Sequence, residues 1–146
     1  MPLKILVVDD DPVSRRLLRQ ILAATEPGCH VVEASSGTAA CRMLEQPGHD
    51  IDLTFLDISM PDFSGFDVLQ RLRAIRLANA PSVIFCSSAN DRPTVLKAAA
   101  AGARHFIVKP PSAAVVAEKI RQVQAVRLAA DGPTRESMDA APAAVL

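Results

Sequence analysis

The stretch Ile5-Leu6-Val7-Val8-Asp9-Asp10-Asp11-Pro12 predicts a strand followed directly by a helix. Its apolar half predicts a strand that is buried on both faces of a sheet. Asp11 followed by Pro12 predicts the start of a helix, because aspartate caps helix N-termini and proline suits the first helical turn. A buried strand followed at once by a helix is typical of an α/β fold with a parallel sheet.

The same alternation of a predicted strand and a predicted helix repeats along the chain. Short apolar runs are separated by stretches of about 12 to 25 residues, the length of a crossover helix with its loops. The predicted strands are Leu3–Val8, Cys29–Ala34, Ile51–Leu56, Ser82–Cys86 and His105–Val108. Right-handed crossovers between them predict a doubly wound, five-stranded parallel sheet with helices on both faces.

Helix signals lie between these strands. The residues expected to cap the second to fifth helices are Ser36, Ser64, Asp91 and Ser112. Ser64 with Asp67 resembles a capping box, and Gly102 lies where a helix often ends in a left-handed residue. The apolar face predicted for the first helix consists of Val13, Leu17, Ile21 and Ala24.

Length and composition indicate one domain. The chain has 146 residues, of which 49% are hydrophobic and 22% charged, which excludes wholesale disorder. Sixteen basic and 16 acidic residues give a net charge of zero, so no overall basic field favours nucleic acid. We expect a domain over residues 1–130 and a flexible tail or linker over 131–146, which contains two prolines and a glycine.

The chain lacks the usual signals for export or membrane insertion. No apolar stretch approaches the roughly 18 residues of a membrane span, and the N-terminal apolar run is too short for a signal peptide. Cys29, Cys41 and Cys86 are an odd set without a C-x-x-C pair, which disfavours a disulfide framework or a zinc site. These features predict a cytoplasmic protein.

Polar side chains follow four of the five predicted strands. Ligands of open α/β sheets bind beyond the carboxyl ends of the strands. The residues at these ends are Asp9, Asp10, Asp11, Asp57, Ser87, Ser88 and Lys109. Clustered carboxylates suit a hard cation such as Mg²⁺, and one carboxylate can attack a phosphoryl group whose oxygens a lysine and a hydroxyl stabilise. Each residue alone has an ordinary explanation as a cap, loop or surface group, but together they favour one site.

The sequence resembles the receiver domains of bacterial response regulators from Leu3 to about Val126. The stretches that carry the resemblance are residues 5–12, 56–61, 64–66, 83–89, 101–103 and 106–110. The resemblance implies a flavodoxin-like (β/α)5 fold with strand order 2-1-3-4-5. It also implies a signalling switch that takes a phosphoryl group from a sensor histidine kinase or a histidine phosphotransfer protein. Such a domain catalyses its own phosphorylation and dephosphorylation and is not otherwise an enzyme.

The resemblance assigns roles at the predicted site. Asp57 is the expected phosphoacceptor, and Lys109 is expected to pair with the phosphoryl oxygens. The expected ligands of Mg²⁺ are the carboxylates of Asp9, Asp10 and Asp57 and the backbone carbonyl of Ser59.

It also implies a switch and two contact surfaces. Ser87 is the expected switch hydroxyl, with Phe106 as the aromatic residue that changes rotamer, and Lys109-Pro110 resembles the family's cis peptide bond. The changing surface covers the fourth helix, fifth strand and fifth helix, roughly Asp91–Gln124, and would serve a downstream protein, a detached output domain or a homodimer. The kinase-facing residues expected on the first helix are Ser14, Arg15 and Leu18.

Other function classes place an aspartate after a strand or use the same fold. An aspartate-nucleophile phosphohydrolase generally needs a second acid two residues on, where this chain has Ser59. A phosphorylation-independent adaptor stays open, and it would bind its partner equally well without Asp57. A dinucleotide-binding module is rejected, because Asp-Asp-Asp-Pro replaces G-x-G-x-x-G after the first strand. Whether the domain acts alone or within a larger protein also stays open.

Overall fold

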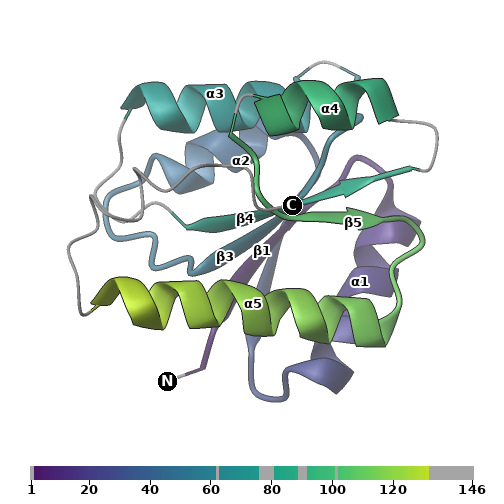
Figure 1. The fold of residues 1–146 in the computed structure, drawn as a ribbon, viewed down its shortest axis with the longest axis vertical. Coiled ribbons are helices and arrows are strands. Elements are labelled where there is room, and N and C mark those ends of the chain that lie inside the picture. The colour runs from purple at the N-terminus through teal and green to yellow at the C-terminus, as the bar shows by residue number, and fades with distance from the viewer. Residues whose placement is uncertain (1, 62, 76–80, 89–91, 101, 132–146) are drawn as a thin grey trace.

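Strands and helices alternate along the described chain, which in this computed structural model comprises residues 2–61, 63–75, 81–88, 92–100 and 102–131. The strands are β1 (Lys4–Val8), β2 (His30–Ala34), β3 (Leu53–Asp57), β4 (Ser82–Ser87) and β5 (Phe106–Val108). The helices are α1 (Pro12–Thr25), α2 (Gly37–Leu44), α3 (Gly65–Ile75), α4 (Arg92–Ala100) and α5 (Ala113–Asp131). Figure 1 shows the strands in the middle of the molecule with helices above and below.

The described strands form one parallel sheet in the order β2-β1-β3-β4-β5, which confirms the predicted topology. The strand order reverses at β1, since the chain pairs β2 with one edge of β1 and then β3 with the other. Val8 lies opposite Leu56 in this register. The residues that follow them, Asp9 and Asp57, are therefore neighbours at the carboxyl edge of the sheet.

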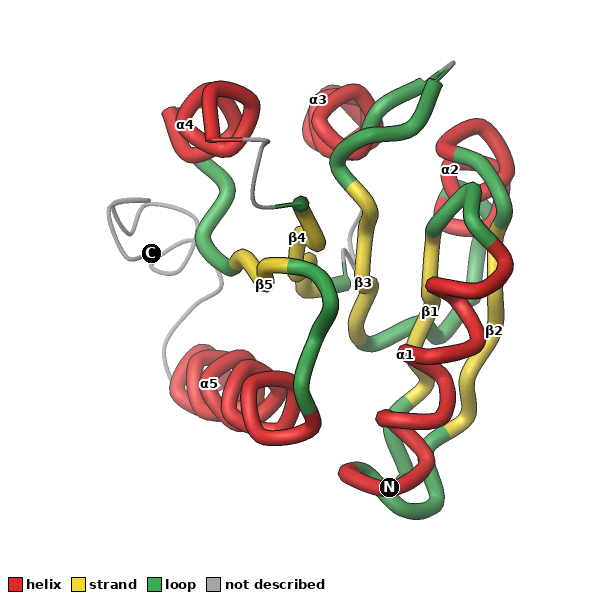
Figure 2. The backbone as a smooth tube through the Cα atoms, turned by 90° about the vertical axis from the view of Figure 1, so that its right-hand side faces the viewer, coloured by secondary structure: helices red, strands yellow, loops and turns green. Residues whose placement is uncertain are grey.

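Helices cover both faces of the sheet, as predicted. α1 and α5 pack on one face, and α2, α3 and α4 pack on the other (Figure 2). Alternate residues of each central strand point into the two cores, so that Phe55 joins the α1–α5 side and Leu56 joins the opposite side. Burial on both faces explains why β1 and β3 are nearly continuous apolar runs in the sequence, whereas the edge strand β2 has exposed His30 and Glu33.

The buried face of α1 differs from the predicted one. Leu18 is 5% exposed and Leu22 is fully buried, whereas Val13 is 72% exposed and Leu17 also reaches solvent. The helix carries two adjacent apolar rows, and hydrophobic periodicity alone does not distinguish them. Packing of α1 between the sheet and α5 selects the row of Leu18 and Leu22.

Helix caps form where the sequence predicts them. The N–H of Val13 donates to Asp11 Oδ1 at 3.0 Å, and the N–H of Ala39 donates to Ser36 Oγ at 3.0 Å. Ser64 and Asp67 form the predicted capping box, with the two backbone N–H groups donating reciprocally at 3.0 and 3.1 Å. Ser112 Oγ accepts from Val115 N–H at 3.2 Å, and Gly102 has a φ of 107°. Asp91, the other predicted cap, lies outside the described residues.

The C-terminal helix runs to Asp131, where the expected tail was to begin. Residues 132–146 of that tail lie outside the described part of the chain, so the division into domain and tail stays a prediction. Among the described helices, none combines the length and the apolar character that a bilayer crossing requires.

Candidate functional site

The polar residues predicted at the strand ends converge at one edge of the sheet. Asp9 follows β1, Asp57 is the last residue of β3, Ser87 is the last residue of β4, and Lys109 follows β5. Backbone pairing draws these ends together: Asp57 lies opposite Cys86, and the N–H of Lys109 donates to the Ser87 carbonyl at 2.7 Å. The site is therefore assembled from four strands by the sheet itself.

Three carboxylates form the acidic part of the site. Asp9, Asp10 and Asp57 each offer an oxygen within 4.8 Å of the others. Asp9 and Asp57 are buried, whereas Asp10 faces solvent at the open side of the cluster. Like charges at this separation repel one another, so the arrangement favours a bound cation.

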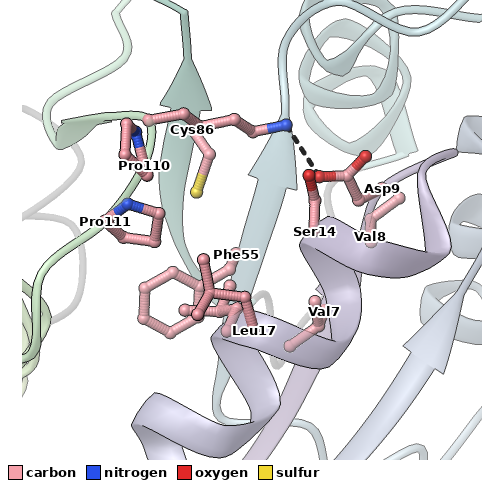
Figure 3. Close-up of a pocket in the computed structure, with 11 residues that line it drawn as sticks. Val7, Val8, Asp9, Ser14, Leu17, Phe55, Cys86, Pro110 and Pro111 are labelled. Atoms are coloured by element: carbon pink, nitrogen blue, oxygen red, sulfur yellow. Dashed lines mark hydrogen bonds and ion pairs between the residues drawn. The ribbon is translucent and has the colours of Figure 1, made fainter.

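Lys109 supplies positive charge to this cluster. Its Nζ donates to Asp9 Oδ2 at 2.7 Å and lies 3.3 Å from Asp57 Oδ2. Figure 3 shows the contact with Asp9 as a dashed line. Burial opposes the charge on Lys109, but the hydrogen bond to Asp9 and the nearby Asp57 outweigh it, and the pKa of Lys109 is raised. The lysine therefore stays an ammonium at neutral pH.

The charge on Asp57 depends on its surroundings. Burial and the neighbouring Asp9 carboxylate raise the pKa of Asp57 to about 6, although Lys109 acts in the opposite direction. The N–H of Ser59 donates to Asp57 Oδ1 at 3.1 Å, which leaves Oδ2 on the side of Lys109. Asp57 is consequently a desolvated carboxylate next to a cation, which suits a nucleophile.

The loop after β1 is held by hydrogen bonds to Asp9. The N–H of Asp9 donates to the Ala34 carbonyl at 3.2 Å, and Asp9 Oδ1 accepts from the N–H of Asp11 at 2.9 Å. The guanidinium of Arg15 donates to the Asp9 carbonyl at 2.7 Å. Arg15 was expected only on a kinase-facing surface. Arg15 lies about one turn into the helix that follows the acidic loop. This position was the sign in the sequence that its side chain could reach back to that loop.

Gly65 packs closely against the backbone of Asp57, a role that the sequence did not assign to it. A Cβ at this position would lie 2.5 Å from the carbonyl oxygen of Asp57, so only glycine fits without a shift. Gly65 is also the first residue of α3, where its low helix propensity offers no advantage. A glycine directly after the Ser64 cap was therefore a detectable sign of close backbone packing.

The two expected switch residues lie on the same side of the sheet. Ser87 is buried at the end of β4, and Phe85, two residues earlier, stacks on Phe106 with ring centroids 5.6 Å apart and an interplanar angle of 24°. Because side chains alternate along a strand, Ser87 points to the face that carries Phe85. Phe106 is partly buried and packs against the core of that same face.

A cavity of about 280 Å³ opens beside the acidic cluster. Figure 3 shows Ser14 and Leu17 of α1 on one side of it and Pro110 and Pro111 on the other. The peptide bond between Lys109 and Pro110 is cis, as the resemblance implies. Leu18, expected on the kinase-facing side of α1, is instead buried in the core because α1 packs on the sheet through this residue.

Comparison with known proteins gives the family of the chain. Residues 5–121 match the family described as the response regulator receiver domain. The chain is 36% identical over 123 residues to the chemotaxis protein CheY of Pseudomonas aeruginosa, with 83% of this chain and 95% of that protein covered. It is 33% identical over 113 residues to the two-component response regulator ORR1 of Oryza sativa subsp. japonica, with 73% of this chain and 49% of the rice protein covered.

A solved structure shares both the fold and part of the sequence. The response regulator receiver domain protein from Clostridium thermocellum matches with a TM-score of 0.72 and 28% identity, with 83% of this chain and 93% of that chain covered. The family match spans four of the five strands in full and all but the first residue of the other. On these grounds the chain belongs to the response regulator receiver domain family of two-component signalling.

Proposed function

We propose that this chain accepts a phosphoryl group on Asp57 from a phosphohistidine of a sensor kinase or histidine phosphotransfer protein. The observation that carries the proposal is the geometry of Asp57, which is 4% exposed and has Oδ2 3.3 Å from the Nζ of Lys109. A desolvated carboxylate beside a fixed ammonium is suited to nucleophilic attack on a phosphoryl group.

The proposed transfer uses an oxygen of Asp57 as the nucleophile. The new bond joins this oxygen to phosphorus, the bond from phosphorus to the histidine nitrogen breaks, and the electron pair of that bond returns to the imidazole. Lys109 stabilises the charge on the phosphoryl oxygens, and the hydroxyl of Ser87 donates to one of them. Hydrolysis of the aspartyl phosphate by water later returns Asp57 to its original state and releases inorganic phosphate.

The donor set fits Mg²⁺, because three carboxylates with an oxygen apiece within 4.8 Å match its preference for hard oxygen ligands. We assign as ligands the carboxylates of Asp9, Asp10 and Asp57 and the backbone carbonyl of Ser59. When bound, Mg²⁺ neutralises part of the negative charge on the reacting groups.

We propose that phosphorylation shifts Ser87 toward the phosphoryl group and Phe106 toward the interior, which changes the surface formed by α4, β5 and α5. The exposed apolar side chains Leu96, Val108 and Val115, one from each of these elements, support a role of this surface in protein contact. A downstream protein, a detached output domain or a second copy of this chain would bind there. The proposal places the protein in the cytoplasm, with neither nucleic acid nor membrane as a direct partner.

Intact mass spectrometry tests the phosphoacceptor. The protein is incubated with Mg²⁺ and acetyl phosphate, and Asp57→Asn is treated in parallel with Asp50→Asn, an exposed aspartate outside the site, as the matched control. We expect one added phosphoryl group on the wild type and on the control, dependent on Mg²⁺, and none on Asp57→Asn. Labelling of Asp57→Asn at the wild-type rate would refute the assignment.

Two further readouts separate the other function classes. Rapid release of many phosphates per chain would identify a phosphohydrolase instead of a switch. Absence of an adduct together with absence of beryllofluoride binding would favour an adaptor that does not use its pocket, whereas beryllofluoride binding without an adduct would indicate a need for the cognate kinase.

A further inference from the structure

We propose that Arg15 is a positioning residue for the cation site. Its guanidinium, anchored on Glu33, holds the peptide between Asp9 and Asp10, and thereby directs the Asp10 carboxylate toward a divalent cation. This inference rests on the proposed function, because it concerns the cation that assists phosphoryl transfer.

The guanidinium of Arg15 bridges two segments of the chain. Its Nε donates to Glu33 Oε1 at 3.1 Å, and NH1 donates to the Asp9 carbonyl at 2.7 Å. The Arg15 side chain is only 18% exposed, so these contacts are partly shielded from water. Glu33 belongs to β2 and pairs through its other oxygen, Oε2, with the more exposed Arg19 at 2.6 Å. The planar guanidinium fork of Arg15 is thus held by Glu33 at Nε and by the Asp9 carbonyl at NH1. A lysine has a single ammonium group and does not reproduce this fork.

The Asp9 carbonyl matters because it belongs to the peptide that leads into Asp10. The Asp9 side chain has its own anchors, the N–H of Asp11 on Oδ1 and Lys109 on Oδ2. Asp10 is exposed, and its carboxylate has no hydrogen bond or ion pair with any residue in the described part of the chain. The backbone therefore sets where the Asp10 Cβ lies and which positions its carboxylate can reach, and the carbonyl at the start of that peptide is held by Arg15.

Charge and geometry act in opposite directions at this position. A positive charge close to the acidic cluster repels a divalent cation, so an effect of charge alone would make Mg²⁺ bind more tightly once Arg15 is removed. Loss of the hydrogen bond to Asp9 would instead release the peptide and weaken binding. The sign of the change in Mg²⁺ affinity therefore distinguishes the two explanations.

Calorimetric titration of the unphosphorylated protein with Mg²⁺ tests the inference without relying on activity. We expect Arg15→Gln to raise the Kd for Mg²⁺ about tenfold, the usual lower range for loss of a residue that orients a metal ligand. Arg15→Lys keeps the charge but lacks the fork, and we expect a similar loss. Arg19→Gln is the matched control, since it removes the same charge from the same glutamate without touching Asp9, and should stay within about twofold of wild type.

Thermal unfolding in EDTA and in Mg²⁺ separates positioning from a merely structural role. A structural role lowers the Tm equally in both buffers, whereas positioning also reduces the rise in Tm that Mg²⁺ produces. If Arg15→Gln does not fold, Arg15→Lys carries the test alone, because it keeps the positive charge and a rise in its Kd for Mg²⁺ then reflects the lost fork. Unchanged or tighter binding in the folded variants would overturn the inference. Failure of the wild type to bind Mg²⁺ would instead overturn the proposed function.

Discussion

Replacing Asp57 with asparagine is expected to stabilise the folded protein at neutral pH when no divalent cation is present. Burial and Asp9 raise the pKa of Asp57 to about 6, against 3.8 for the group in its ordinary state. A difference of roughly two pH units corresponds to about 3 kcal/mol, at 1.36 kcal/mol for each unit. Asparagine carries no charge, so it avoids this unfavourable contribution while its oxygen can still accept from the Ser59 N–H.

The pH dependence of the effect follows from the direction of the pKa shift. Between about pH 4 and pH 6 the folded protein retains a proton on Asp57 that the unfolded chain has released. Wild-type stability therefore falls as the pH rises through this window, and the full penalty remains above it. The gain in the free energy of unfolding of Asp57→Asn over wild type should be close to zero at pH 4 and should reach its maximum near pH 7.

Urea unfolding followed by far-ultraviolet circular dichroism measures this effect, since the chain has no Trp or Tyr for intrinsic fluorescence. The measurements are made in EDTA from pH 4 to pH 7.5, with Asp50→Asn as the control. Asp50 has a largely exposed carboxylate that pairs with Lys4, so its replacement should change stability by less than about 1 kcal/mol at any pH. The reasoning would be refuted if Asp57→Asn were less stable than wild type at pH 7.5, or if its gain were as large at pH 4.

Two other substitutions test packing around the site and in the sheet. Gly65→Ala places a Cβ 2.5 Å from the Asp57 carbonyl oxygen. We therefore expect the free energy of unfolding to fall by about 1 to 3 kcal/mol and labelling by acetyl phosphate to be slower. Wild-type values for both quantities would show that the loop accommodates the methyl group without effect. Thr54→Val removes a fully buried hydroxyl that has no hydrogen-bond partner in the described structure, so we expect a gain of about 1 kcal/mol in urea unfolding. A loss of similar size would show that the hydroxyl has a favourable partner.

The central strands β1 and β3 were predictable because burial on both faces leaves a continuous apolar signal, but this signal does not locate their ends. Ile51 was predicted as the first residue of the third strand, and its side chain is indeed buried. The strand nevertheless begins at Leu53, after the chain has turned at Asp50, which has a φ of 53°. Hydrophobicity reports where a side chain lies, whereas strand pairing depends on the backbone.

The residues gathered at the site were predictable for a similar reason. Parallel strands place all their carboxyl ends at one edge, so a polar residue after each apolar run is brought to the same place without knowledge of any contact. Arg15 and Gly65 could not be placed in this way. The reach of Arg15 depends on the direction in which α1 leaves the loop, and the fit of Gly65 depends on how closely α3 approaches β3.

The pairing of Lys109 also lies beyond the sequence pattern, and it bears directly on the proposed transfer. The lysine lies closer to Asp9, at 2.7 Å, than to Asp57, at 3.3 Å. Because Lys109 already contacts Asp9 Oδ2, the use of that oxygen as a cation ligand requires the lysine to move away from it. Asp57 Oδ2 is the other carboxylate oxygen that Lys109 already pairs with, so under the proposed function the ammonium is brought to the group that receives phosphate.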